Sequence, residues 1–122
     1  MKILISIKPE YVEKILSGEK HYEFRKRSCN NNVHSMLIYE TTPVKKIVAE
    51  VEIASILEGS PLAIWDQTHD YAGISKDKYF DYFNHNDHAV AYVLGQIHRF
   101  SPPHNLSDYG IKHAPQSFIY LK

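Results

Sequence analysis

Residues 2–27 read KILISIKPEYVEKILSGEKHYEFRKR and carry the clearest secondary-structure pattern of the chain. Residues 2–7 are rich in isoleucine and leucine, which favours a strand. Pro9 suits the first turn of a helix, and Gly18 suits the left-handed residue that ends one. This stretch therefore predicts a strand that is followed at once by a short amphipathic helix.

A second strand is expected directly after that helix. Residues 20–27 alternate, because Tyr22 and Phe24 share one face of a strand while Glu23, Arg25 and Arg27 share the other. Lys20 and Glu23 are three positions apart, so inside one regular strand they would point to opposite faces. We expect the strand to begin after Lys20, which would let both side chains reach the same cleft.

The remaining pattern gives the element order β-α-β-β-β-αα-β-β. The expected elements are strands over 35–41, 46–57, 88–100 (with Gly95 at a possible bulge) and 117–121, helices opened by Ser60-Pro61 and Ser75, and an irregular stretch bounded by Pro102, Pro103 and Pro115. The helices are grouped and do not alternate with strands, which argues against a doubly wound parallel sheet. The prediction is an α+β domain on a mostly antiparallel sheet that is able to close into a barrel.

Composition limits the class of protein. The 122 residues, 43% hydrophobic and 23% charged, suffice for one domain over 1–122 with a core of its own. The single cysteine, Cys29, excludes an internal disulfide and a cysteine-rich zinc site. No apolar run approaches the roughly 18 residues of a membrane span, and the apolar start of the chain is too short for a signal peptide. A cytoplasmic protein without a cofactor is expected.

The charge is balanced overall but not along the chain. Nine basic and five acidic residues give residues 1–46 a charge of +4, which the rest of the chain cancels. A neutral chain does not attract nucleic acid through its overall field, although the basic residues of 20–27 offer a local surface for phosphates. The alternative is a solvated strand edge on which lysines discourage pairing with other chains.

Residues 18–25 read GEKHYEFR and have the form G-x-K-x-x-E-x-R. This motif, the helix before it and the closing residues 114–121, APQSFIYL, resemble the ASCH domain, the activating-signal-cointegrator homology family of the PUA-like superfamily. The likeness covers nearly the whole chain and is weakest over 60–86. It implies a small PUA-like β-barrel with helices packed around it, and a cleft beside the motif that binds RNA or modified nucleosides. Family members include transcription regulators, and PUA-like relatives deacylate cytidine or cut RNA.

The resemblance places the polar groups of a binding cleft. Lys20, Glu23 and Arg25 would supply them, and Lys20 is a candidate base if a ring such as Tyr22 partly desolvates it. The alternative for Lys20 is a surface lysine whose stem covers an aromatic ring. The further binding residues expected are Lys26 and Arg27 toward phosphates, and Ser6, Lys8, Gln116 and Ser117 as neighbours.

A hydrolase is the alternative function for the same cleft. Lys20 would act as base or electrostatic stabiliser and Glu23 as proton carrier. Hydrolase relatives pair the motif lysine with a threonine where Glu23 stands here, and they add a separate acid. This chain departs from that pattern, and Glu50 and Glu52 are conceivable substitutes for the acid.

Other clusters are interpreted structurally. His85-Asn86-Asp87-His88 is read as a polar turn, since a zinc site needs three or four convergent ligands. The aromatic residues of 60–86 are read as core, with Phe80 and Phe83 buried. A protein–protein adaptor that uses Tyr79 and Tyr82 is the non-catalytic alternative.

Overall fold

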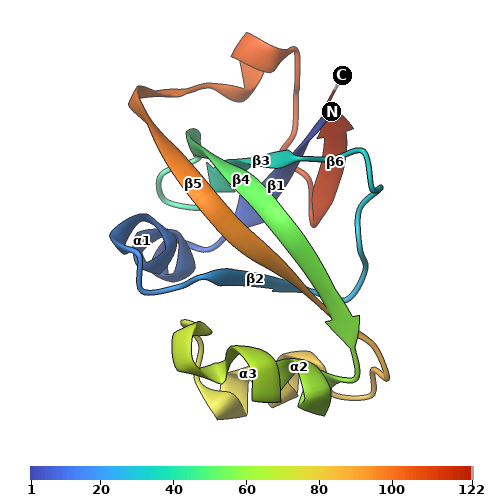
Figure 1. The fold of residues 1–122 in the computed structure, drawn as a ribbon. Coiled ribbons are helices and arrows are strands. Elements are labelled where there is room, and N and C mark those ends of the chain that lie inside the picture. Colours follow the sequence, from blue (N-terminus) through green and yellow to red (C-terminus); the bar gives the residue numbers. More distant parts are fainter. Residues whose placement is uncertain (122) are drawn as a thin grey trace.

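A computed structural model of the chain describes residues 1–121. In chain order, its elements are β1 (Lys2–Ile7), α1 (Pro9–Ser17), β2 (Tyr22–Arg25), β3 (Ser35–Glu40), β4 (Lys46–Gly59), α2 (Pro61–Thr68), the 3₁₀ helix η1 (His69–Tyr71), α3 (Lys76–Tyr82), β5 (Ala89–His104), the 3₁₀ helix η2 (Leu106–Tyr109) and β6 (Phe118–Leu121) (Figure 1). Within these residues, no helix is long and apolar enough to cross a membrane.

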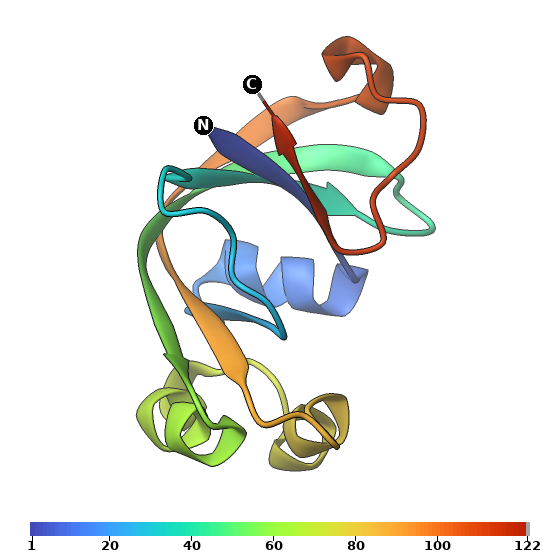
Figure 2. The same ribbon diagram turned by 90° about the vertical axis from the view of Figure 1, so that its right-hand side faces the viewer.

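The six strands form one curled sheet in the order β2-β5-β4-β3-β1-β6 (Figures 1 and 2). Strands β1 and β3 are parallel, whereas every other neighbouring pair is antiparallel. The long strands β4 and β5 carry the bend, and the sheet becomes a half-barrel whose two edge strands, β2 and β6, do not pair with each other within the described residues. The predicted α+β fold with a mostly antiparallel, barrel-like sheet is confirmed.

Helix α1 fills the inside of this curve (Figure 2). It begins at Pro9, and it ends where Gly18 adopts a φ of 86° and donates its N–H to the Ile15 carbonyl. Val12 and Ile15 point into the sheet and are buried against its inner face. The helix therefore fixes where the loop that holds Lys20 leaves the core.

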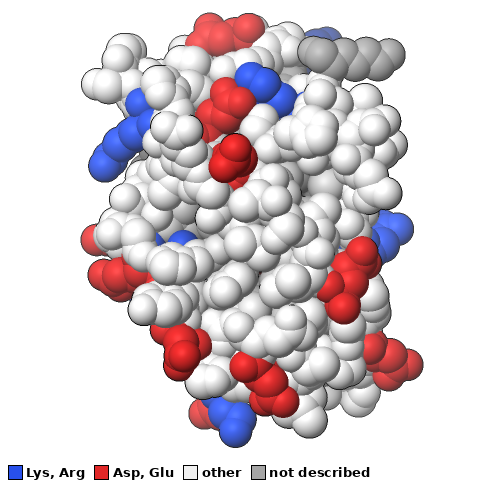
Figure 3. Space-filling model, viewed as in Figure 1, with Lys and Arg blue, Asp and Glu red and all other residues white. Residues whose placement is uncertain are grey.

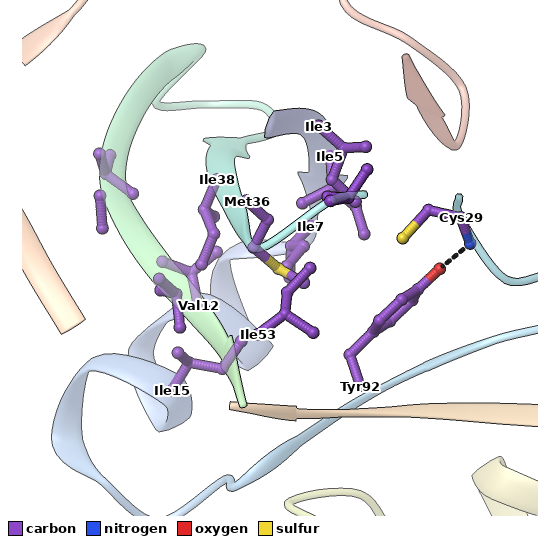
Figure 4. Packing of buried hydrophobic residues seen from close by; sticks show 14 of the residues in the cluster. Ile3, Ile5, Ile7, Val12, Ile15, Cys29, Met36, Ile38, Ile53 and Tyr92 are labelled. Carbon is purple, nitrogen blue, oxygen red and sulfur yellow. Dashed lines mark hydrogen bonds between the residues drawn. The ribbon is translucent and has the colours of Figure 1, made fainter. Parts of the chain in front are cut away.

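The inner core joins isoleucines and a methionine of β1, β3 and β4 to α1 (Figure 4). Tyr92 of β5 reaches this core with its ring, and its hydroxyl accepts a hydrogen bond of 2.9 Å from the Cys29 N–H and donates one of 3.3 Å to the Arg27 carbonyl. Burial also raises the pKa of the Tyr92 hydroxyl. The Tyr92 side chain thus anchors the loop that follows β2.

We expect Tyr92→Phe to lower the free energy of unfolding by about 1–3 kcal/mol, because the buried Cys29 N–H would lose its acceptor. Urea denaturation measures this loss. Tyr71→Phe, at an exposed ring, is the matched control and should stay within about 0.5 kcal/mol of the unmodified protein. Equal urea midpoints for Tyr92→Phe and the unmodified protein would contradict the anchoring role.

Helices α2 and α3 form a second layer below β2 and the ends of β4 and β5 (Figure 1). Each begins at a serine whose hydroxyl accepts a backbone N–H, Ser60 for α2 and Ser75 for α3. Tyr79 is fully buried there and meets Phe24 of β2 edge to face, with the ring centroids 5.1 Å apart. Phe83 is buried as expected, but Phe80 is only partly buried.

The prediction of an irregular stretch from Pro102 was wrong, because β5 continues to His104. The first half of β5 is paired on both sides, with β2 and β4, whereas its second half pairs with β4 alone. Both prolines fall in a bulge between the pairs Ala49–Arg99 and Ile47–His104, where a missing N–H costs no ladder bond. The bulge expected at Gly95 is confirmed by the register shift around it.

Candidate functional site

A cavity of about 580 Å³, hereafter the Lys20 cavity, opens where β1, α1, β2 and α3 meet. Its walls come from segments far apart in the sequence, which only the fold brings together. The lining residues are Ser6, Ile7, Lys8, Glu10, Tyr11, Lys20, Glu23, Phe24, Arg25, Thr41, Ile74, Lys78, Asp81, Tyr82 and Gln116.

Most of the residues singled out from the sequence lie in this cavity. The lining includes Ser6, Lys8, Lys20, Glu23, Arg25 and Gln116. Three others are outside it. Arg27 and Ser117 are exposed, and Lys26 borders the mouth with its ammonium 4.7 Å from the ring centroid of Tyr82. Strand β2 begins at Tyr22, so the expectation that it starts after Lys20 is confirmed, and Lys20 and Glu23 share one cavity.

The Lys20 side chain is only 4% exposed, although it ends in a charged group. Its Nζ donates a hydrogen bond of 2.6 Å to the Ala72 carbonyl, the one acceptor that it contacts within residues 1–121. The ammonium also lies 5.2 Å from the ring centroid of Tyr11 and 4.8 Å from that of Phe24. These rings, and not Tyr22, form the aromatic surroundings of Lys20.

This environment changes the protonation of Lys20. Burial lowers the pKa of the Lys20 amine from 10.5 to about 8, because the charged form loses its hydration. The negative charge of Glu23 raises the pKa again in part, whereas the positive charges of Lys14 and Arg25 lower it further. At pH 7 about a tenth of the amine is therefore neutral and able to accept a proton, and at pH 8 about half of it is.

Glu23 and Arg25 form a buried ion pair on the face of β2 that borders the cavity. Arg25 donates to Glu23 Oε2 from Nε at 3.0 Å and from Nη2 at 2.9 Å. The same Nη2 donates to the Ser6 carbonyl of β1 at 2.8 Å. The pair leaves Glu23 Oε1 available to a ligand, and it ties β2 to a strand near the opposite edge of the sheet.

Sequence reasoning missed the residues that line the mouth. Lys78, Asp81 and Tyr82 of α3 are spaced three and four apart, so they share one helical face. That spacing was visible in the sequence, but nothing local indicated that this face would lie opposite β2. Lys78 also approaches Glu10 of α1, with 3.8 Å between Nζ and Oε2.

Glu50 and Glu52, the conceivable acids of the alternative function, do not reach the Lys20 cavity. They lie in a separate polar hollow with His34 and His98, which is lined by β4, β5 and the residues around the start of β3. Glu50 is also engaged by Lys2 at 3.0 Å and by Ser35 at 2.9 Å. The acids that line the Lys20 cavity are Glu10, Glu23 and Asp81.

Two other clusters are placed by the fold. Residues 84–88, which carry the histidines His85 and His88, form an irregular turn, and among residues 1–121 no three side chains of metal-binding type are grouped as ligands. Tyr79 is fully buried, so it cannot contribute to the adaptor surface considered above.

The charged groups show where a polyanion would not dock. On the face seen in Figure 3, acidic side chains are spread over the lower half, where the helices lie, and basic side chains stand apart from one another. Such a face repels phosphates. Among the described residues, this face therefore presents no continuous basic surface to an anionic polymer.

Comparison with known proteins agrees with this geometry. The family model of the ASCH domain matches residues 5–101. An ASCH domain-containing ribonuclease of Zymomonas mobilis is 32% identical over 124 residues, which cover 98% of this chain and 83% of that protein. The large ribosomal subunit protein uL22 of Ureaplasma parvum is 33% identical over 121 residues, but the chain spans only 39% of its length.

Solved structures give the same result. The crystal structure of ASCH from Zymomonas mobilis superposes with a TM-score of 0.89 at 29% identity, and the match covers 99% of this chain and 87% of that one. The likeness therefore extends through the helical layer over residues 60–86, where the sequence pattern is weakest.

Proposed function

Because the chain belongs to the ASCH domain family, we propose that it binds single-stranded RNA, or a modified nucleoside, in the Lys20 cavity. The observation that supports this most is the nearly buried Lys20, which faces the same cavity as the Glu23–Arg25 pair. The cavity volume of about 580 Å³ is within the roughly 300–1,000 Å³ common for small-molecule sites. A cytoplasmic location is part of the proposal.

The lining supplies what one nucleotide unit requires. Tyr11 and Tyr82 offer aromatic surfaces on which a base can stack. Glu23 Oε1 can accept a hydrogen bond from an exocyclic amine or a ribose hydroxyl. Lys20 can donate to a carbonyl or phosphate oxygen. Outside the mouth, the exposed Lys26 and Arg27 would meet the phosphates of neighbouring nucleotides.

We expect the affinity for single-stranded RNA to fall steeply with salt, because neutralisation of phosphates releases counterions. Fluorescence anisotropy at several salt concentrations measures the slope of log K against log salt. The double variant Lys26→Ala, Arg27→Ala should reduce that slope by about 1.4, which is roughly 0.7 for each phosphate that the protein no longer neutralises. Arg99→Ala, on β5, serves as the control. RNA binding that is absent, or indifferent to salt, would refute the proposal.

RNA cleavage is the second candidate function. It is favoured by a lysine with a pKa of about 8 that faces the cavity, and by the relative named as a ribonuclease. The neutral Lys20 amine would take the proton from a ribose 2′-hydroxyl, whose oxygen then attacks the adjacent phosphorus. The bond from phosphorus to the 5′-oxygen breaks, and that oxygen takes a proton from water. The products are a 2′,3′-cyclic phosphate and a 5′-hydroxyl end.

The substrate that the protein turns over distinguishes RNA cleavage from deacylation of a modified nucleoside. Release of a cyclic phosphate end from RNA supports cleavage, whereas release of free acid from an acylated cytidine supports amide hydrolysis. Glu23 stands where the deacylating relatives have a threonine, so we favour RNA as the substrate.

A further inference from the structure

The segment Tyr71–Ile74, which runs from the last residue of η1 toward α3 and is hereafter the 71–74 segment, closes over the side chain of Lys20. Its Ala72 carbonyl accepts the Lys20 ammonium at 2.6 Å. Next to this bond, the Tyr71 carbonyl accepts the His21 N–H at 2.9 Å, and the two rings stack with centroids 4.3 Å apart and planes 3° apart. The 71–74 segment is thus attached to the motif at two consecutive residues.

Gly73 lies against the stem of Lys20 in this arrangement. A Cβ atom at position 73 would stand 2.5 Å from Lys20 Cβ, 2.5 Å from Cγ and 2.9 Å from Cδ. Cβ is at the fixed end of the side chain, so it cannot move away without moving the backbone, and Cγ and Cδ can move away only by a change of rotamer. Gly73 also has a φ of 67°, a conformation that other residues rarely adopt.

Glycine is needed at position 73 for two reasons, its positive φ and its close contact with Lys20. Gly110 shares only the first of them. It has a φ of 70°, nearly that of Gly73, but nothing lies within 4 Å of the Cβ that a side chain would add. An alanine at position 110 would therefore carry the backbone strain alone. At position 73 an alanine would carry the same strain and, in addition, a steric conflict with Lys20.

We propose that Gly73 is a positioning residue for Lys20: its bare backbone lets the lysine stem lie beneath the 71–74 segment, so that Nζ is held at the Ala72 carbonyl and directed into the Lys20 cavity. The inference rests on the proposed function of that cavity. It adds a residue outside the ASCH motif, 53 positions from Lys20 along the sequence, that sets where the ammonium lies.

The consequence of a side chain at position 73 is specific. The Lys20 stem would be displaced, its bond to Ala72 would be broken, and the ammonium would become hydrated. The charges that act on the amine come from β2 (Glu23 and Arg25) and α1 (Lys14), and Glu10, Lys78 and Asp81 also line the cavity. Lys14 Nζ itself contacts the Gly73 carbonyl at 3.5 Å, whereas the Glu23–Arg25 pair lies on β2 and would stay in place. Because burial is the largest cause of the lowered pKa of Lys20, recovery of ordinary lysine titration would report chiefly the loss of burial.

The test compares Gly73→Ala with Gly110→Ala. NMR of the Lys20 Cε–Hε groups across the alkaline range gives the titration midpoint of the amine without any RNA present. We expect Gly73→Ala to raise that midpoint by about one pH unit or more, a tenfold gain in proton affinity, and to weaken RNA binding at least fivefold. Gly110→Ala should change neither quantity. An unchanged midpoint and unchanged RNA affinity in folded Gly73→Ala would overturn the proposal.

A second variant covers the case in which Gly73→Ala does not fold. Lys20→Gly removes Cβ, Cγ and Cδ, all three atoms that an alanine at position 73 would strike. The double variant Lys20→Gly, Gly73→Ala should then regain a cooperative urea transition. If it also fails to fold, backbone strain alone explains the glycine and the proposal is wrong. Absence of RNA binding by the unmodified protein would count against the proposed function only, since the titration needs no RNA.

Discussion

Lys20→Met should lower the rate of the proposed RNA cleavage by about 100-fold or more, because the cavity would lose its proton acceptor. The affinity for RNA should fall by about tenfold through the removal of one charged donor. Methionine has nearly the length of lysine and fits the apolar surroundings of Tyr11 and Phe24. The loss of activity would therefore occur in a protein whose packing is preserved.

The same variant should be at least as stable as the unmodified protein at neutral pH. The pKa of Lys20 is about 8 in the folded protein and 10.5 ordinarily, so the unfolded chain binds this proton more tightly. Below pH 8 both states are charged, and burial of the charge costs roughly 3 kcal/mol at most. As the pH rises above 8 the folded state loses its proton first, and this cost declines. Urea denaturation on either side of pH 8 should show the rise in the unmodified protein and not in Lys20→Met.

The pH dependence of cleavage distinguishes two roles of Lys20. If the neutral amine is the base, the rate should rise with pH and level off near 8, where the amine has lost its proton. If the ammonium stabilises charge on the phosphate, the rate should fall above that pH. Initial rates on a short single-stranded RNA decide between them.

Lys76→Met is the matched control for these measurements. Lys76 is an exposed lysine of α3 that does not line the Lys20 cavity, so its replacement should leave rate and affinity within about twofold. Full cleavage and binding by Lys20→Met, or equal losses in both variants, would show that the Lys20 cavity is not the functional site.

Local signals were enough for most of the fold. Pro9 and Gly18 bound α1, and Ser60 and Ser75 begin α2 and α3, because caps and glycine turns act within a few residues. The continuation of β5 past its prolines was missed for a related reason. Whether a proline is tolerated there depends on which side of the strand is paired, and only the sheet order decides that.

Only the wall of the Lys20 cavity that the G-x-K-x-x-E-x-R motif forms was predictable from the sequence. Lys20 and Glu23 share a short junction, so their common direction followed from where the strand begins. The opposite wall follows from tertiary structure: Ala72 and Asp81 are brought to Lys20 by the packing of Tyr79 against Phe24. The spacing of apolar residues within one helix or strand does not specify a contact between two distant elements. No local pattern indicated that Lys20 would be buried.

Arg25→Ala should be the most destabilising change in the Lys20 cavity, with a loss of about 3–5 kcal/mol in the free energy of unfolding. The two side chains of the pair are only 13% and 9% exposed, so removal of the guanidinium leaves Glu23 as a buried charge without its partner. It also removes the bond to the Ser6 carbonyl. Strands β2 and β1 stand four places apart in the sheet order, so Arg25 connects the two sides of the half-barrel where no backbone pairing does so within residues 1–121.

Arg25 contributes an ion pair with Glu23 and a hydrogen bond to the Ser6 carbonyl. Urea denaturation of Arg25→Ala, Glu23→Gln and Arg25→Lys distinguishes the two contributions. Glu23→Gln keeps a polar group beside the guanidinium and leaves the bond to Ser6, so its loss should be smaller than that of Arg25→Ala. Arg25→Lys keeps the charge but not the planar fork that reaches Glu23 and Ser6 together, so its loss should fall between the two. Arg99→Ala, at an exposed arginine of β5, should change stability by about 0.5 kcal/mol or less. If Arg25→Ala were no more destabilising than Arg99→Ala, the connection that Arg25 makes across the half-barrel would not contribute to the free energy of unfolding. The shape of the Lys20 cavity would then have to be maintained by α1 and α3 alone.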